Sequence, residues 1–195
     1  MLWTLGVSII DVQAIGPNGS SVGFATLNRF VHELLGVHMS LYVITDWLSI
    51  LPLCFILGFA VLGLAQWIKR RRILAVDLSI LALGVFYIVV MALYLFFEKV
   101  VINYRPVLID GYLEASYPSS TTMLVLCVMP TAIMQLKSRI KKRALACLVS
   151  GWIIAFTAFM VIGRLVSGVH WFTDIIGGAL LSAGLVMTYY SVIKS

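Results

Sequence analysis

Charged side chains are scarce in this 195-residue chain: Asp, Glu, Lys and Arg make up 11% of it, whereas 62% of its residues are hydrophobic. The mean hydropathy of +1.05 excludes an ordinary soluble globular composition. Apolar stretches of about 20 residues can cross a bilayer core of about 30 Å as helices, and several follow one another here. The sequence therefore predicts a single all-α domain, a polytopic bundle of about five to six transmembrane helices.

Cysteine is also rare, and its spacing gives no indication of a metal site or a disulfide framework. Cys54, Cys127 and Cys147 all lie inside apolar stretches, so they are predicted to be small buried residues. No cluster of His, Cys and carboxylate residues has ligand spacing, and neither a metal nor another cofactor is expected. The N-terminus lacks the basic start and small-residue cleavage site of a cleavable signal peptide.

The chain is divided by short polar breaks. Residues 1–15 are predicted to form a partial first span, because their apolar run is too short to cross a bilayer. It is either the outer end of a helix whose beginning is missing or a partly inserted segment. Residues 21–36 alternate apolar and charged side chains at helical spacing, which indicates an amphipathic helix at the membrane interface. Five full spans are then predicted, at residues 41–68, 73–97, 118–136, 144–165 and 172–192.

Two basic clusters, at residues 69–72 and 137–143, set the orientation, since cytoplasmic loops collect Lys and Arg. Residues 98–117 and 164–172 then lie together on the extracytoplasmic side, and the C-terminus is cytoplasmic. The net charge of +6 is thus explained by topology and does not indicate nucleic-acid binding. The short outer loops suit a bacterial plasma membrane.

Basic residues remain outside these clusters at a few positions. Lys99, Arg105 and Arg164 lie in the two external segments, the side that usually lacks such residues. An anionic ligand would account for them, and anchoring to lipid headgroups is the alternative. Asp46 and Asp77 lie near the outer and inner ends of spans, where Asp46 could join an outer pocket or either residue could make an interhelical hydrogen bond.

The external segments also carry groups suited to phosphate chemistry. His170 and Asp174 are four residues apart, so on a helix the carboxylate could hold one ring nitrogen and free the other as a nucleophile or base. A structural hydrogen bond is the alternative. Residues 117–122 place a proline and small hydroxyl residues at a helix start, which is either an anion site or an ordinary N-cap.

In order along the chain, Arg-Pro at 105–106, Pro-Ser-Ser-Thr at 118–121 and Arg-x5-His-x3-Asp at 164–174 resemble the motifs of the type 2 phosphatidic acid phosphatase superfamily. The resemblance covers roughly residues 40–192. It implies that His170 attacks phosphorus to form a phosphohistidine and that Asp174 orients it. The expected phosphate contacts are Arg105, Arg164, Ser119, Ser120, Thr121 and Lys99.

Two positions depart from the family's motifs. Glu98 stands where the family has Lys, and Lys99 is one residue out of register, so it can contact phosphate only if the backbone shifts. Thr121 stands where the family has a His that acts as general acid. His32 or His38, near the outer face, could supply that proton, but polar residues of an interfacial helix are the simpler interpretation.

The absence of a general acid at Thr121 affects which leaving group, and hence which substrate, we expect. An alkoxide leaving group, whose conjugate acid has a pKa of roughly 16, needs a proton as its bond to phosphorus breaks. A lipid monophosphate that leaves from a diphosphate has a second pKa of about 6 and needs none. We therefore expect a preference for a polyprenyl diphosphate, such as undecaprenyl diphosphate, over a phosphatidate.

The sequence thus predicts a metal-independent phosphatase that acts on a lipid phosphate or diphosphate in the outer leaflet. A non-catalytic protein that binds or transports lipid phosphates is the rival function, and a phosphotransferase with an alcohol acceptor is a third. An oriented His170 favours chemistry, whereas the replacements at Glu98 and Thr121 favour binding alone.

Overall fold

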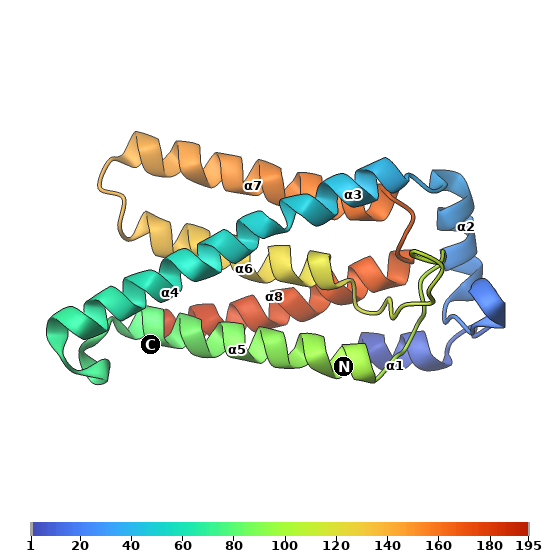
Figure 1. Cartoon of the computed structure of the whole chain (residues 1–195), viewed down its shortest axis with the longest axis horizontal. Coiled ribbons are helices and arrows are strands. Elements are labelled where there is room, and N and C mark those ends of the chain that lie inside the picture. The colour runs from blue at the N-terminus through green and yellow to red at the C-terminus, as the bar shows by residue number, and fades with distance from the viewer. Residues whose placement is uncertain (1, 195) are drawn as a thin grey trace.

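The computed structural model describes residues 2–194, in which the regular secondary structure is helical and three isolated β-bridges occur in loops. Long helices run side by side along one axis (Figure 1), so the predicted all-α bundle is confirmed. The α-helices are α1 (Leu2–Ile9), α2 (Ala25–Leu35), α3 (Met39–Leu48), α4 (Ile50–Arg70), α5 (Leu78–Lys99), α6 (Ser120–Lys137), α7 (Arg143–Val166) and α8 (Phe172–Lys194), and the short 3-10 helices are η1 (Pro17–Gly19) and η2 (Ile73–Ala75).

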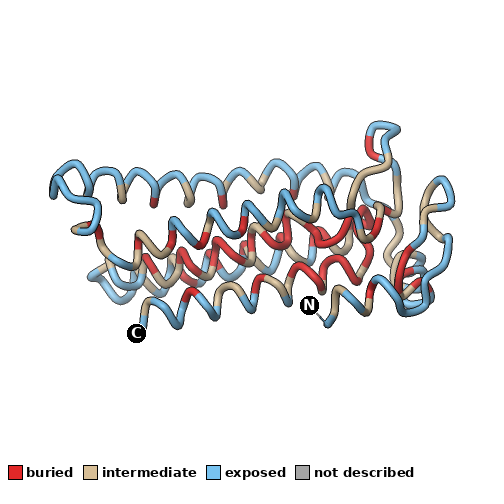
Figure 2. The backbone as a smooth tube through the Cα atoms, turned by 90° about the horizontal axis from the view of Figure 1, so that it is seen from below, coloured by how far each residue is buried: buried red, intermediate tan, exposed pale blue. Residues whose placement is uncertain are grey.

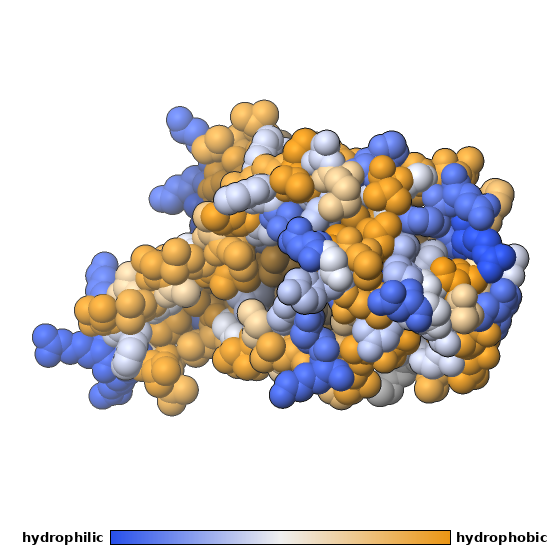
Figure 3. Space-filling model, turned by 45° about the vertical axis from the view of Figure 1, so that its right-hand side comes forward, coloured by the Kyte–Doolittle hydropathy of each residue, from blue (hydrophilic) through white to orange (hydrophobic). Residues whose placement is uncertain are grey.

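Five segments of the described chain are long and apolar enough to cross a membrane: α5, α6, α7, α8 and the combined segment Met39–Arg70. In the combined segment, α3 ends and α4 begins at Ser49, where a single helix was predicted. Pro52 follows in the first turn of α4 and has no N–H to donate to the carbonyl of Leu48. Apolar side chains cover much of the face drawn in Figure 3, as expected of an integral membrane protein.

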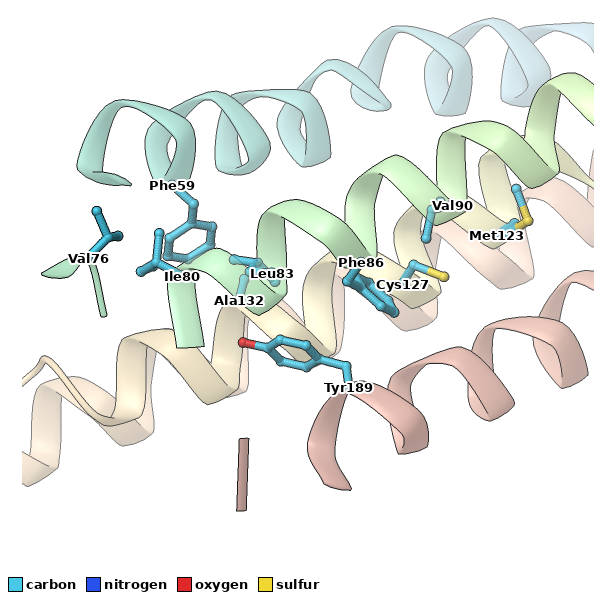
Figure 4. Close-up of a cluster of buried hydrophobic side chains, with 10 residues drawn as sticks. All are labelled: Phe59, Val76, Ile80, Leu83, Phe86, Val90, Met123, Cys127, Ala132 and Tyr189. Atoms are coloured by element: carbon cyan, nitrogen blue, oxygen red, sulfur yellow. The ribbon is translucent and has the colours of Figure 1, made fainter. Parts of the chain in front are cut away.

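The core of the bundle is built around α6, which packs against α4, α5, α7 and α8. Figure 2 shows the buried residues gathered inside the bundle. One buried cluster joins α4, α5, α6 and α8 (Figure 4), and a second joins α6 to α7. The first cluster consists of Phe59, Val76, Ile80, Leu83, Phe86, Val90, Met123, Cys127, Ala132 and Tyr189.

The two basic loops and the C-terminal end of α8 lie at one end of the bundle (Figure 1). At this end Asp77 accepts hydrogen bonds from Gln66 Nε2 at 2.8 Å and from Arg70 Nη1 at 2.9 Å. These contacts hold the residues before α5 as a turn. Helix α5 therefore begins at Leu78, five residues later than the sequence predicted.

The opposite end of the bundle carries α1, α2 and the loops that lead into α6 and α8. Helix α1 has eight residues, and the Trp3 indole N–H donates to the carbonyl of Thr173 at 3.2 Å. Helix α2 lies across this end (Figure 1) and exposes Leu27, Phe30 and Leu34. That apolar face matches the amphipathic pattern predicted for residues 21–36.

The prediction that the three cysteines are buried is correct for Cys127 and wrong for Cys54 and Cys147, which are exposed. The latter two lie on outward faces of α4 and α7. A residue in an apolar stretch of a membrane helix can face either the lipid or the core of the bundle. The stretch alone therefore does not predict that the residue is buried.

Candidate active site

The loop between α5 and α6, residues 100–119, contains a short hairpin. Its tip is Asp110-Gly111, with φ values of 49° and 83°, which is typical of a two-residue hairpin turn. The N–H of Arg105 in one arm donates to the carbonyl of Glu114 in the other at 3.0 Å. The hairpin thus holds Arg105 beside the residues that lead into α6.

His170 lies in the turn between α7 and α8 and is 3% exposed. Gly168 in this turn has a φ of 67°, and a Cβ added there would lie 2.0 Å from the carbonyl oxygen of Gly36, so the turn requires glycine. His170 Nδ1 lies 3.0 Å from Ser116 Oγ and 3.2 Å from Ser116 O. His170 Nε2 is buried and has no hydrogen-bond partner.

Asp174, in the first turn of α8, is fully buried and accepts three hydrogen bonds. Its Oδ1 accepts from Asn103 Nδ2 at 3.0 Å, and its Oδ2 accepts from Ser116 Oγ at 2.5 Å and from the N–H of Trp171 at 3.0 Å. The carboxylate thus reaches His170 through Ser116, in place of the direct contact predicted from their spacing. That prediction assumed one helix, and α8 begins after His170.

This arrangement fixes which ring nitrogen of His170 carries the proton. The Ser116 hydroxyl has one proton, which it donates to Asp174, so Nδ1 must be the donor toward the oxygen atoms of Ser116. Nε2 then keeps its lone pair. Burial and the charges of Arg105 and Arg164 lower the pKa of His170 well below its ordinary value. The imidazole is therefore neutral at neutral pH, as a nucleophile must be.

We expect His170 to keep this neutral form at pH values below about 6.5, because burial disfavours the imidazolium. NMR of ring-labelled histidine in detergent-solubilised protein measures the protonation of each nitrogen, and the spectrum of His170→Ala assigns the signal. Nδ1 should carry the proton and Nε2 should not at about pH 6. A proton on Nε2, or a titration midpoint at or above the ordinary value, would contradict this arrangement.

Two buried arginines lie at the site. Arg105 Nε is 3.0 Å from Glu114 Oε2, and its Nη1 is buried without a hydrogen-bond partner. Arg164 is 1% exposed, and its Nη2 is 3.2 Å from Asp46 Oδ1, while its Nε has no partner. Each arginine therefore has one acidic partner and at least one nitrogen left to bind an anion.

The start of α6 contributes hydroxyl groups. Ser119 is fully buried, its N–H donates to the carbonyl of Asp174 at 3.1 Å, and its Oγ has no hydrogen-bond partner. A polar cavity of about 220 Å³ is lined by Ser120 together with His170 and Arg105. Thr121 lines an adjoining groove. Ser120 thus lines the cavity, whereas Ser119 and Arg164 are buried outside its lining.

The polar cavity has two acidic residues in its lining, Glu98 and Glu114. Lys99 is exposed at the end of α5 and does not line it. Of these two neighbouring residues, Glu98 therefore lines the cavity and Lys99 does not.

An apolar path leads away from the polar cavity. The groove that contains Thr121 and Asp46 has a volume of about 260 Å³ and shares Tyr94, Ser120 and Met123 with the cavity. It continues into an apolar groove of about 530 Å³ between α4 and α5, with which it shares Ile56, Tyr87 and Met91. A polar site thus opens into a groove that follows the membrane-spanning helices.

The two remaining histidines lie away from the cavity. The His32 ring packs against Trp171, with centroids 5.4 Å apart, and His38 Nε2 is 2.9 Å from the carbonyl of Leu35. Neither lines the polar cavity, which favours the interpretation that they are structural.

Several residues of the site were not singled out by sequence reasoning. Ser116 and Asn103 connect Asp174 to the hairpin, and Asn28 of α2 binds Thr173 through both ends of its amide, at 2.9 and 3.1 Å. Asn103 and Ser116 could have been found from the sequence, because they lie within three residues of the first and second motifs. Asn28 gave no such signal, because its contact is 145 residues away in the sequence.

A comparison with curated protein sequences found no match. Among solved structures, the fold is similar to a crystal structure described as the first transmembrane PAP2 type phosphatidylglycerolphosphate phosphatase, from Bacillus subtilis, with a TM-score of 0.58. The two are 19% identical, and the match covers 87% of this chain and 86% of that chain, which shows a common fold. The model of the PAP2 superfamily matches residues 80–195. Because this match covers more than half of the chain, the protein belongs to the PAP2 superfamily, as its three motifs predicted.

Proposed function

We propose that this protein is a membrane lipid phosphatase in which His170 forms a phosphohistidine. One observation carries the proposal: buried polar atoms from separate segments lack hydrogen-bond partners among the described residues. Those on the residues expected to contact phosphate are His170 Nε2, Arg105 Nη1, Arg164 Nε and Ser119 Oγ, and further ones are Arg105 Nε, Thr122 Oγ1 and Ser20 Oγ. Buried polar groups are nearly always satisfied, so this set indicates a missing ligand. Two cationic donors and a hydroxyl beside a nucleophile suit a phosphoryl group.

The chemistry follows from the unprotonated Nε2. Its lone pair attacks phosphorus, the Nε2–P bond forms and the bond from phosphorus to the lipid oxygen breaks. Arg105, Arg164 and Ser119 stabilise the charge on the phosphoryl oxygens. Water then attacks phosphorus, the Nε2–P bond breaks, the water's second proton passes to solvent, and inorganic phosphate and neutral His170 result.

The apolar path supports a long lipid tail. Along α5 it runs from Tyr94 to Ile80, a rise of about 21 Å at 1.5 Å per residue. One leaflet accounts for about half of a hydrocarbon core of about 30 Å, so the path extends beyond a single leaflet. A polyprenyl chain is long enough to follow it, and an extended fatty acyl chain can also occupy most of it.

The leaving group favours a diphosphate substrate. No histidine besides His170 lines the polar cavity, and Thr121 faces the groove, so a histidine acid for an alkoxide leaving group is missing among the residues described. A lipid monophosphate needs no such acid. We therefore propose a polyprenyl diphosphate, such as undecaprenyl diphosphate, as the preferred substrate.

The proposal is tested by phosphate release from purified protein in detergent. A polyprenyl diphosphate, a polyprenyl monophosphate and a phosphatidate are compared at equal concentration. We expect release from all or some of them, fastest from the diphosphate. A preference for phosphatidate would overturn the leaving-group argument, and no release from any substrate would overturn the hydrolase and favour a lipid-phosphate binding protein.

The charge of Glu98 opposes phosphate binding, since Glu98 lines the cavity beside Arg105. We expect Glu98→Lys to lower the inhibition constant of inorganic phosphate by about tenfold, because an unfavourable charge becomes a favourable one. Lys99→Ala is the matched control and should change it less than about twofold, because Lys99 is outside the cavity. Weaker inhibition in Glu98→Lys would show that Glu98 is not directed toward the phosphate.

The position of the basic loops supports an extracytoplasmic site. Residues 69–72 and 137–143 lie at the end of the bundle opposite to His170, together with the C-terminal end of α8. Loops rich in Lys and Arg are normally cytoplasmic, so we propose that His170 lies outside and the C-terminus inside. Accessibility of single cysteines introduced at Asp110 and Ser138 to a membrane-impermeant reagent measures the orientation, and labelling at Ser138 alone would reverse it.

A further inference from the structure

Helix α3 lies outside residues 80–195, the part of the chain matched by the family model, yet it contacts the phosphate arginines. It packs closely on α7 at Gly163, where an added Cβ would lie 2.8 Å from Thr45 Cγ2. Arg164, the next residue of α7, also reaches α3, as its hydrogen bonds to residues of that helix show. The site includes groups that the three family motifs do not contain.

The terminal nitrogens of Arg164 are occupied by α3. Nη1 donates to the carbonyl of Tyr42 and to Thr45 Oγ1, both at 3.3 Å, and Nη2 donates to Asp46 Oδ1 at 3.2 Å. Nε has no partner, and Nη2 has a second N–H beyond the one that Asp46 accepts. The contacts with α3 thus fix the plane of the guanidinium and leave two N–H groups for a ligand.

The ring of Tyr42 contacts both arginines. The guanidinium carbon of Arg164 is 4.7 Å from the ring centroid, and that of Arg105 is 5.7 Å from it. Both distances lie within the range of a cation–π interaction. The two buried guanidinium groups repel each other because both are positively charged. The electron-rich ring of Tyr42 attracts both of them and so opposes their separation. Among the described residues, Tyr42 is the aromatic side chain that lies against both Arg105 and Arg164.

We infer that Tyr42 is a positioning residue that holds Arg105 and Arg164 at the spacing required by the phosphoryl group. The inference rests on the proposed function, because it takes the two arginines as the phosphate clamp. It adds a residue from α3 to a site whose motifs lie on α6, α7, α8 and the loops before α6 and α8. The feature that acts is the electron-rich face of the ring, while the hydroxyl is dispensable.

The test measures binding of inorganic phosphate by calorimetry in detergent, together with kcat and KM for the polyprenyl diphosphate. Tyr42→Phe keeps the ring face and should bind phosphate within about twofold of the unaltered protein. Tyr42→Leu removes it and should weaken phosphate binding by about tenfold and raise KM in parallel. Tyr112→Leu, at a position 75% exposed on the hairpin, is the matched control and should leave both unchanged.

A variant that keeps the shape of the ring separates this role from packing. Pentafluorophenylalanine at position 42 has nearly the same size but a reversed ring quadrupole, so it should weaken phosphate binding as Tyr42→Leu does. Binding equal to that of Tyr42→Phe would overturn the inference, even if Tyr42→Leu fails to fold. Phosphate binding is measured without turnover, so a protein that binds phosphate in this pattern but releases none from lipids would contradict only the proposed function.

Discussion

His170→Ala should abolish phosphate release, with a loss of about 10⁴-fold or more in kcat, because removal of a covalent nucleophile leaves only the binding contributions of the site. His170 Nε2 is the buried, unpartnered nitrogen beside the phosphate arginines. The fall should be in kcat, since Arg105, Arg164 and Ser119 remain to bind the substrate. Initial rates of phosphate release from the polyprenyl diphosphate measure it.

His38→Ala is the matched control. His38 is exposed on the same side of the bundle and lies outside the polar cavity, so its removal should leave kcat within about twofold. Calorimetry should show that His170→Ala still binds inorganic phosphate. If His170→Ala retained a tenth of the activity, the nucleophile would have to be another group.

Asp174→Asn should have the second largest effect, about 10³- to 10⁴-fold in kcat, with little change in fold. The carboxylate accepts from Ser116, Asn103 and Trp171, whereas an amide has only one acceptor atom. If the amide nitrogen faces Ser116, the Ser116 hydroxyl accepts from it and turns its own proton to His170 Nδ1. Nε2 then carries the ring proton and has no lone pair for attack.

NMR of the ring nitrogens checks this explanation directly. In Asp174→Asn the ring proton of His170 should move from Nδ1 to Nε2, in parallel with the loss of activity. Asp110→Asn makes the same chemical change at the exposed hairpin tip, where the positive φ of 49° suits Asn, and should leave kcat unchanged. Full activity in Asp174→Asn would show that the Ser116 relay does not control the nucleophile.

Hydropathy was sufficient to predict the number of membrane-spanning segments and their approximate bounds, because the bilayer sets the length of an apolar helix. It did not predict where helices break. The interruption at Ser49 depends on the missing N–H of Pro52, and the late start of α5 depends on hydrogen bonds from Gln66 and Arg70 to Asp77. Such details are determined by single backbone and side-chain contacts, which the average hydropathy of a segment does not register.

At the site, the motifs predicted which external segments meet, and the structure brings Arg105, Arg164, Ser119, Ser120, His170 and Asp174 to one end of the bundle. The contacts among them were less predictable. Ser116 mediates between Asp174 and His170 because the helix begins after His170, and Tyr42 reaches the arginines from a helix more than 60 residues earlier in the chain. These contacts depend on tertiary packing, so no local spacing in the sequence indicated them.

The proposed mechanism requires a covalent phosphoryl group on His170. Trapping this phosphohistidine tests the mechanism most directly. Protein is mixed rapidly with polyprenyl diphosphate that is radiolabelled in its terminal phosphate, then quenched at alkaline pH, where a phosphorus–nitrogen bond survives. Digestion and mass spectrometry identify the labelled peptide and atom. We expect a label on Nε2 of His170 that appears and decays with turnover and is absent from His170→Ala. Turnover without labelled protein, or a label on another residue, would contradict it.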